Sequence, residues 1–598
     1  MVINLTAQQH EAFAALKRFL ENETNCFILK GYAGTGKTFM IKLLTEYLSE
    51  IRRSFFLAAP TGRAARVITE RSGAAASTIH SLIYSLKDMR EYKIEDENAS
   101  ETFRFYFTLK PNMSATNAVY IIDESSMISD MYSDEEFARF GSGFLLKDLL
   151  NYINFDHNDH NKKVIFIGDD AQLPPVGMNF SPAMDKDYLI DKHSISVETF
   201  ELTEVVRHKQ ESGIIINAIE IRKSLEAGIF NKLNISTDYP DIHKAKNETF
   251  IDHYLQACNR RIDRETIAIA YSNAKVKEYN RAIRSQFFPN LDVVTAGDRL
   301  ICVRNGSVLL NGDFATVLEV SPDVELKTTN LKKKDKEGKL QIMPIKLAFR
   351  KVAIEFNGAV RRDCLILEEL LYSEKRDLSS DENRALYVDF IKRNPRLKRN
   401  TAEFGNALSE DPYFNALRFK FGYAITCHKA QGGEWKNVFI DCELKQNLLR
   451  KNSYRWLYTA ITRAKETLYV MNAPHITPFD EITVPENKQN TDNSEPIDSN
   501  LTQKEDIKNS HLEFPKPFLR EFYEKIMEKI ASSEIIITDI MHRDYLEKYY
   551  FKKADEYAEI NFNYNGKDLF TRCLPDSNRC SSQPFADYIV ALVGLKAK

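Results

Sequence analysis

The most informative stretch of the chain is Gly31-Tyr32-Ala33-Gly34-Thr35-Gly36-Lys37-Thr38. Its spacing is that of a loop that wraps phosphate groups between a buried strand and a helix. The apolar run 26–29 suits that strand, and 39–48 carries apolar residues at helical spacing. The sequence therefore predicts an α/β domain with a nucleotide site. The alternative, a glycine-rich turn with no ligand, leaves the flanking pattern unexplained.

Each residue type in this loop has a chemical task. Gly34 and Gly36 let backbone N–H groups around Thr35 turn towards phosphate oxygens. Lys37 reaches the β and γ phosphates of ATP, and the Thr38 hydroxyl can ligate Mg²⁺. Upstream, Gln9 lies in an expected amphipathic helix. Its amide suits an adenine edge, although a solvated helix glutamine is the plainer interpretation of this residue alone.

The whole chain has 598 residues, of which 43% are hydrophobic, so it is long enough for about three to five domains. We find no secretory pattern and no stretch of membrane-spanning length, so we expect a cytoplasmic protein with no membrane partner. The eight cysteines lack metal-ligand spacing and fit a reducing compartment. A net charge of −3 argues against a uniformly basic coat but allows a local basic groove.

Two further apolar runs end in polar residues of the kind that phosphate chemistry uses. Run 119–122 ends in Asp123 and Glu124, and run 164–167 leads into a loop with Gln172. Charges at the end of a buried strand are costly unless they have partners or chemistry. We expect Asp123 to hold the Mg²⁺ shell and Glu124 to orient and deprotonate the attacking water. Gln172 can contact a γ-phosphate.

Other segments between these runs indicate contacts with nucleic acid. Run 55–59 ends near Thr61 and Arg63, at the edge of a parallel sheet where ligands usually bind. A second polar loop contains His80; the alternative interpretation of this loop is a helix cap. The segment 87–110 alternates like one strand of a projecting hairpin. Its rings Phe103 and Phe105 could stack on bases, and burial against the main sheet is the equally weighted alternative.

Taken together, these motifs resemble those of a superfamily 1 DNA helicase of the RecD/Dda type. Stretches 202–207, 421–432 and 456–465 resemble further motifs of the family, in the family's order. The resemblance covers residues 1 to about 472 and implies two RecA-like domains with ATP between them. It implies that Arg207 and Arg463 reach the phosphoryl group and that Gly432 lies at the nucleotide. It also implies that single-stranded DNA is held by Thr61, His80, Thr426 and His428.

This interpretation divides an α/β protein into five parts. They are RecA-like motor domain 1 (1–195, hairpin 86–112), motor domain 2 (196–320 and 412–472), an SH3-like barrel insertion with a helical projection (321–411), a flexible linker (473–511) and a small accessory α+β domain (512–598). The family resemblance does not cover the accessory domain. We assign it no function and keep it as a candidate contact for protein partners.

The resemblance implies ATP-driven translocation along single-stranded DNA in the 5′ to 3′ direction, with unwinding at duplex junctions. One alternative is a nucleic-acid-stimulated ATPase that remodels RNA or protein–DNA complexes without processive unwinding. A DNA-binding scaffold that uses ATP only as a conformational switch is another. The presence of Glu124, Gln172, Arg207 and Arg463 argues against the scaffold, because a switch can lose its hydrolytic residues.

Overall fold

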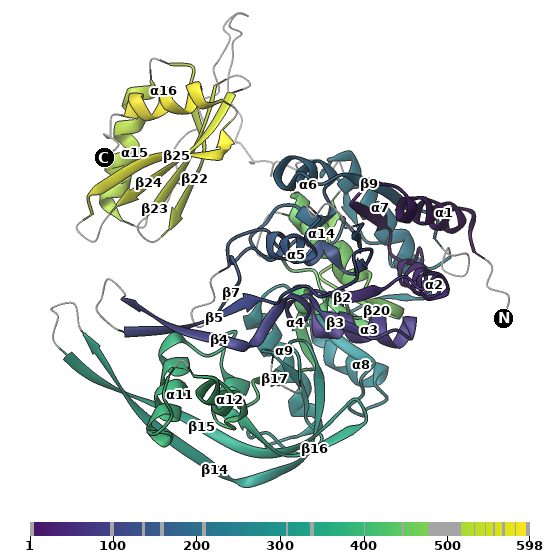
Figure 1. Ribbon diagram of the computed structural model, residues 1–598. Coiled ribbons are helices and arrows are strands. Elements are labelled where there is room, and N and C mark those ends of the chain that lie inside the picture. The colour runs from purple at the N-terminus through teal and green to yellow at the C-terminus, as the bar shows by residue number, and fades with distance from the viewer. Residues whose placement is uncertain are drawn as a thin grey trace, which may run out of the picture. The chain divides into compact units, whose positions relative to one another are not determined.

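A computed structural model shows the chain as two compact units, 1–483 and 484–598 (Figure 1). It describes residues 5–95, 101–133, 138–155, 161–205, 211–305, 309–334, 340–399, 401–444, 448–476, 516–531, 533–543, 546–553, 556–564, 568–580 and 582–593. The predicted linker lies almost wholly outside them. Within these ranges, no helix has the length and apolar character that a bilayer crossing requires.

Motor domain 1 is a six-stranded parallel sheet in the order β3-β2-β6-β8-β1-β9. Its strands are β1 (Cys26–Gly31), β2 (Phe55–Ala59), β3 (Ala76–Thr78), β6 (Val119–Ile122), β8 (Lys163–Gly168) and β9 (Val197–Leu202). Alternate residues of each strand face opposite sides of the sheet. Helices therefore cover both faces: α1 (Ala7–Glu21), α2 (Lys37–Glu50) and α3 (Gly62–Ser72) on one, and α4 (Ile79–Ile83), α5 (Leu145–Ile153) and α6 (Lys186–His193) on the other.

The predicted end of motor domain 1 at residue 195 is wrong. Strand β9 pairs in parallel with β1, and Leu202 lies opposite Gly31. The pairing extends the sheet of motor domain 1 to residue 202, so the stretch 202–207 begins on the edge strand of this domain. Sequence alternation in 197–202 does not tell which sheet the strand will join.

Motor domain 2 is a second parallel sheet, in the order β11-β20-β19-β12-β18. Its strands are β11 (Ile242–Lys244), β12 (Thr266–Ala270), β18 (Ala424–Thr426), β19 (Trp435–Asp441) and β20 (Ala464–Met471). One face packs on α7 (Gly213–Ala227), α13 (Cys427–Ala430) and α14 (Lys451–Ile461), and the other on α8 (Phe250–Ala257) and α9 (Asn273–Phe287). A short pair, β10 (Leu233–Asn234) with β21 (His475–Ile476), lies beside it. The residues of β6 and β8 in the first sheet and of β12 in the second are all buried.

The insertion has wider limits than the predicted 321–411. It is a five-stranded antiparallel sheet of β13 (Arg299–Cys302), β14 (Phe314–Lys334), β15 (Leu340–Phe356), β16 (Ala359–Leu367) and β17 (Phe419–Phe421). Because β17 pairs with β13 across more than a hundred residues, strands on both sides of the predicted limits belong to it. Helices α10 (Glu368–Tyr372), α11 (Ser380–Arg393) and α12 (Ala402–Glu410) form the helical projection.

The predicted hairpin exists. Strands β4 (Tyr84–Glu95) and β5 (Glu101–Leu109) pair antiparallel, and β7 (Ala138–Phe140) adds to β5. Phe105 of β5 is 4% exposed and packs against Tyr387 of α11 and Phe414, with ring centroids 5.3 and 6.2 Å away. This burial corrects the interpretation of Phe105 as an exposed base-stacking ring. The helical projection covers it, a partner that no local pattern specifies.

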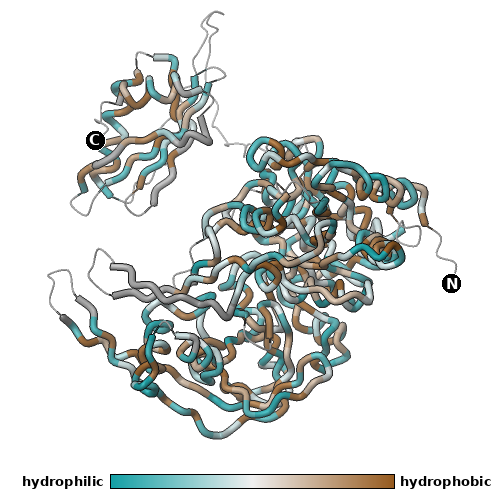
Figure 2. The backbone as a smooth tube through the Cα atoms, viewed as in Figure 1, coloured by the Kyte–Doolittle hydropathy of each residue, from teal (hydrophilic) through white to brown (hydrophobic). Residues whose placement is uncertain are grey.

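The C-terminal unit is a small α+β fold. Its antiparallel sheet is β22 (Ile536–Arg543), β23 (Leu546–Lys553), β24 (Glu556–Tyr564) and β25 (Phe570–Cys580), in that order. Helices α15 (Pro517–Ile530) and α16 (Gln583–Val593) pack on one face through a separate core. Hydrophobic and hydrophilic residues alternate along β24 (Figure 2). The unit therefore has its own hydrophobic core.

Candidate nucleotide site and nucleic-acid interface

The phosphate-binding loop joins β1 to α2 and is shaped to receive an anion. Gly34 and Gly36 have φ of 82° and 87°, a left-handed conformation that side chains rarely adopt. Lys37 Nζ donates to the carbonyl oxygens of Gly31 and Tyr32, 2.7 and 3.0 Å away, so it lies across the loop. These backbone amides and this ammonium group fit the phosphates of a nucleotide.

The structure gives Gln9 a different task from the predicted adenine contact. Its Oε1 accepts from the Thr6 N–H at 3.1 Å in a capping box, and its Nε2 donates to the Thr35 carbonyl at 2.9 Å. Both ends of the amide are therefore engaged with protein. Gln9 is 4% exposed and ties α1 to the phosphate-binding loop. The S/T-x-x-Q pattern of a capping box was the signal for this role.

The two acidic residues that follow β6 form a coupled pair. Burial, together with the neighbouring Glu124 carboxylate, raises the pKa of Asp123 to about 7. Burial also raises the pKa of Glu124, and the charges of Arg463 and Lys37 oppose that shift. Glu124 adopts a left-handed φ of 50°, a strained conformation that is frequent at functional sites. The oxygen donors of Asp123 and Thr38 fit Mg²⁺.

Motor domain 2 completes the site through side chains of α14. The Tyr458 hydroxyl accepts from the Ala33 N–H of the phosphate-binding loop at 3.1 Å and donates to Asp169 at 2.6 Å. Thr459 Oγ1 accepts from the Leu173 N–H at 2.9 Å. Hydrogen bonds thus connect the two motor domains directly at the nucleotide site. Tyr458 and Thr459 lie inside the stretch 456–465, but no local pattern distinguishes them from their neighbours.

Arg222 of α7 is a site residue that the sequence analysis missed. Its guanidinium pairs with Asp169, with Asp170 at 3.0 Å and with Glu201 at 2.9 Å, all three in motor domain 1. It is 2% exposed. An arginine on an amphipathic helix outside every motif carries no sequence signal for this role.

Arg463 and Gln172, which the family resemblance assigns to the nucleotide site, are both buried polar side chains. Arg463 is 5% exposed and donates from Nε to the Thr459 carbonyl at 3.0 Å, while its charge opposes the burial that raises the pKa of Glu124. Gln172 is 4% exposed, and its Oε1 has no partner among the described residues. Each is a polar group at the cleft between the motor domains. Arg207 lies outside the described residues.

Helix α3 forms a contact between the two motor domains, and this changes the interpretation of Arg63. The guanidinium lies 4.0 Å from the Trp435 ring, and a Cβ at Gly433 would come within 2.5 Å of its Cζ. Burial lowers the pKa of Arg63 to about 9. Arg63 is therefore an interdomain residue in this structure and not an open phosphate contact. Gly432, predicted at the nucleotide, lies against Ala64 and Thr61 of the same helix.

The remaining predicted DNA contacts lie at strand ends. Thr61 and Thr78 cap α3 and α4, so the predicted cap alternative holds for the polar loop that contains His80. His80 packs edge-on to Phe140 with 5.2 Å between ring centroids, and burial lowers its pKa. Thr426 ends β18, and His428 next to it is exposed. The Phe103 side chain lies outside what the structure describes.

A cavity of about 800 Å³ begins at Thr426 and follows one side of α9. Seven of its lining residues are basic and two are acidic, which makes it an electropositive groove: Lys277, Arg281, Arg284, Lys375, Arg376, Lys420 and Lys429 against Asp292 and Glu374. Burial and the charge of Arg376 lower the pKa of Lys429 to about 8. This groove fits the backbone of a polyanion.

The fold and this site define a P-loop nucleotide-binding protein whose site is shared by two α/β domains and lies beside a basic groove. Family models match three parts of the chain: an AAA domain over residues 4–140, a UvrD-like helicase C-terminal domain over 421–471, and a TATA-binding-like protein domain of the TOTE conflict systems over 516–593. The chain is homologous to the superfamily 1 helicases of the RecD/Dda group.

Individual relatives agree with this assignment. The ATP-dependent DNA helicase dda of Enterobacteria phage T4 is 25% identical over 78% of this chain and 99% of its own length. The uncharacterized protein R530 of Acanthamoeba polyphaga mimivirus is 23% identical over 78% of this chain and 99% of its own. The uncharacterized protein MJ1519 of Methanocaldococcus jannaschii is 25% identical over 91% of this chain, which spans 44% of that relative.

Proposed function

We propose that the protein is an ATP-dependent DNA helicase that moves 5′ to 3′ along single-stranded DNA and unwinds duplex at a junction. The observation that carries the proposal is the hydrogen bond from the Ala33 N–H of the phosphate-binding loop to the Tyr458 hydroxyl of motor domain 2, whose helix α9 also lines the basic groove. The same domain thus contacts the nucleotide site and lines the groove proposed for the DNA strand. Motion of one motor domain against the other would change both together.

The residues of the cleft support hydrolysis. The amides of the phosphate-binding loop and Lys37 would hold the β and γ phosphates, and Glu124 would take a proton from the attacking water. When bound, Mg²⁺ supplies charge neutralisation at the phosphates, and Thr38 and Asp123 would hold it. Arg463 would stabilise negative charge on the transferring phosphoryl group, a role that Arg207 would share. Gln172 would contact the γ-phosphate and so respond to its presence.

The path of the strand follows the carboxyl ends of both parallel sheets, where Thr61 and Thr426 lie. His80 and His428 would contact the strand beside them. Lys429 and the rest of the basic groove would hold phosphates without reading sequence. The 5′ to 3′ direction rests on homology to the RecD/Dda group. We place the wedge that splits the duplex at the β4–β5 hairpin, which the helical projection supports through the contacts of Phe105.

A strand-displacement assay tests this function. We expect the protein to unwind a DNA duplex with a 5′ single-stranded tail and not one with only a 3′ tail, and to prefer DNA to RNA. Glu124→Gln should reduce ATP turnover by about 10²–10⁴-fold and abolish unwinding while ATP still binds, because the amide cannot accept a proton. DNA-stimulated ATPase without displacement on any tail would favour a remodelling ATPase instead. Unwinding from 3′ tails would contradict the direction.

We also propose that the insertion is the SH3-like barrel of related helicases. Five antiparallel strands with bulges in β14 and β15 support this, because bulges bend strands towards closure. The domain limits that follow are 1–202 for motor domain 1, about 299–421 for the insertion, and the remainder up to 476 for motor domain 2. Loss of the helical projection should leave ATPase on single strands and remove unwinding.

A second proposed function concerns the C-terminal unit, which we propose binds nucleic acid through the sheet face opposite its helices. Since Tyr549, Phe551, Ile560 and Phe562 pack under the helices, the alternate positions lie on the other face. They include Tyr550, Lys552, Tyr557, Asn561 and Asn563, and also Lys548, whose ammonium pairs with Glu559 on the same face. Amide, phenol and ammonium groups are those that contact bases and phosphates, and the match to a TATA-binding-like domain supports this use.

Blunt duplex DNA tests the C-terminal proposal, because it offers the motor no single-stranded tail. In the full chain, Lys552→Glu with Tyr557→Ala should weaken binding of blunt duplex several-fold. The control Lys525→Glu, an exposed residue on α15 with the same charge change, should leave binding unchanged. Equal effects of the two changes would remove the assignment of this face.

A further inference from the structure

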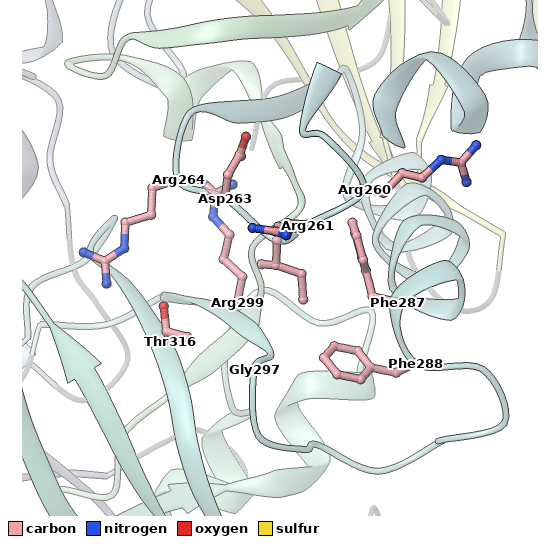
Figure 3. A pocket seen from close by; sticks show the side chains of 10 residues that line it. Arg260, Arg261, Asp263, Arg264, Phe287, Phe288, Gly297, Arg299 and Thr316 are labelled. Atoms are coloured by element: carbon pink, nitrogen blue, oxygen red, sulfur yellow. The ribbon is translucent and has the colours of Figure 1, made fainter. Parts of the chain in front are cut away.

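A second cavity, of about 410 Å³, is lined by residues of motor domain 2 together with Arg299 and Thr316 of the insertion (Figure 3). Residues 260–264 line it and lead into the amino end of β12, whereas Thr426 stands at the carboxyl end of the parallel neighbour β18. The cavity shares no lining residue with the nucleotide site. It is therefore separate from that site, and we call it the arginine pocket.

The arginine pocket carries an excess of positive charge. Arg260, Arg261, Arg264 and Arg299 line it, with Asp263 as its acidic residue. Arg264 pairs with Glu355, and the Asp263 carboxylate accepts from the Thr266 N–H at 2.9 Å. Among the described residues, Arg260, Arg261 and Arg299 have no ion pair. Figure 3 shows the Arg261 guanidinium between Asp263 and Phe287.

Arg299 gives the pocket a buried positive charge. The residue is 3% exposed, donates to the Thr266 carbonyl at 2.7 Å and lies 4.5 Å from the Phe314 ring, while its Nε has no partner in the described part of the chain. The charge of Asp263 in the same cavity offsets part of the cost of this burial, but among the described residues Arg299 remains a buried cation without an ion pair, which is unfavourable. Its field extends into the cavity that it lines, and an anion there would offset part of this cost.

The arginine pocket adjoins the basic groove, because Phe288 lines both cavities. The groove follows α9 from Asn273 to Ser285 on one side of the helix. A helix of 15 residues is about 22 Å long. A strand that enters at Thr426 and follows α9 therefore reaches Phe288 and then Arg261.

We propose that the arginine pocket is a distal phosphate subsite for the single strand, reached along α9 from the groove. The inference rests on the proposed function, since it assigns a further contact to the same strand. The guanidinium of Arg261 would bind a backbone phosphate, and the half-buried rings of Phe287 and Phe288 would pack against a base or sugar. A free nucleotide carries the same phosphate and base, and the test separates the two sources.

The test compares two lengths of labelled oligodeoxythymidine, about 8 and about 24 nucleotides, by fluorescence anisotropy on the full chain. Arg261→Glu should weaken binding of the long strand about fivefold and lower its salt dependence by about one phosphate, because one contact is lost. Binding of the short strand, which ends within the groove, should change less than about twofold. The control Lys246→Glu makes the same charge change at an exposed residue of motor domain 2 that lines neither cavity.

The outcomes distinguish a phosphate of the DNA strand from the phosphate of a free nucleotide. Selective loss with the long strand supports the inference, and ATPase at saturating short strand should stay unchanged. Intact binding of both strands to the variant, or equal loss of both, would overturn it. So would micromolar binding of thymidine monophosphate that Arg261→Glu abolishes while the long strand still binds. If the unmodified protein binds neither strand, the proposed function itself fails and the inference with it.

Discussion

The two motor domains share one architecture, but opposite charges gather where they face each other. Motor domain 1 contributes carboxylates after its strands, Asp123, Glu124 and Asp169, and motor domain 2 contributes Arg222 and Arg463. The phosphate-binding loop belongs to the first domain alone. Each domain therefore holds half of the chemistry. From this distribution of charge we expect hydrolysis to depend on contact across the cleft, so variants on the second domain should be as damaging as variants in the loop.

The largest effect on ATP turnover should come from replacing Arg463 of motor domain 2. Arg463→Ala should lower DNA-stimulated ATP turnover by about 10³-fold, within the range for arginines that reach a transferring phosphoryl group. ATP binding, followed by a fluorescent analogue, should weaken far less, because the loop that holds the phosphates is intact. Arg463→Lys keeps the charge but not the guanidinium geometry and should recover only part of the activity. Turnover near that of the unmodified protein in Arg463→Ala would show that motor domain 1 acts alone.

A smaller effect should follow from loosening the contact of α3 with motor domain 2. Arg63→Met keeps most of the stem but removes the cation over Trp435, an interaction of about 2 kcal/mol when desolvated. We expect DNA-stimulated ATPase to fall about tenfold and basal ATPase to change little. The reason is that α3 begins directly after Thr61, which we propose contacts the single-stranded DNA. The control Arg71→Met removes the exposed Arg71–Glu434 pair, 2.7 Å, on the same helix. A partly exposed pair of this kind is worth at most about 1 kcal/mol.

The nucleotide half of the site could be predicted from sequence because its determinants are local. A glycine loop, its lysine and the carboxylates at strand ends each lie within a few residues of one another. Arg222, the burial of Phe105 and the position of Arg63 could not be predicted, because their partners lie far away in the chain: Asp169, Tyr387 and Trp435. The insertion limits failed for the same reason, since β13 and β17 meet only in the folded sheet.

A still smaller effect concerns the basic groove, which motor domain 2 and the insertion line together and in which two lysines can lose their charge. Burial and nearby cations lower the pKa of Lys429 and of Lys420 to about 8. These lysines are charged below that pH, so strand affinity should be constant there and fall as pH rises through 8. We expect a threefold to tenfold loss, roughly, between pH 7 and 9 in anisotropy titrations. Lys429→Arg, which stays charged, should flatten the profile. An unchanged profile in the variant would exclude Lys429 as its source.

The smallest effect should come from removing everything after residue 480. The compact unit 1–483 contains both motor sheets, the insertion and the hairpin, and the C-terminal unit has its own core. Every contact that completes the nucleotide site, from Tyr458 to Ala33 and from Arg222 to Asp169, lies inside the retained part. The truncated protein should therefore fold, with a thermal midpoint close to that of the full chain, and keep DNA-stimulated ATPase within about twofold. Binding of blunt duplex should be lost with the C-terminal unit, which separates its contribution from that of the motor. Aggregation, or a large fall in ATPase, would show that the charge complementarity of the two motor domains is not sufficient and that the C-terminal unit supports the cleft.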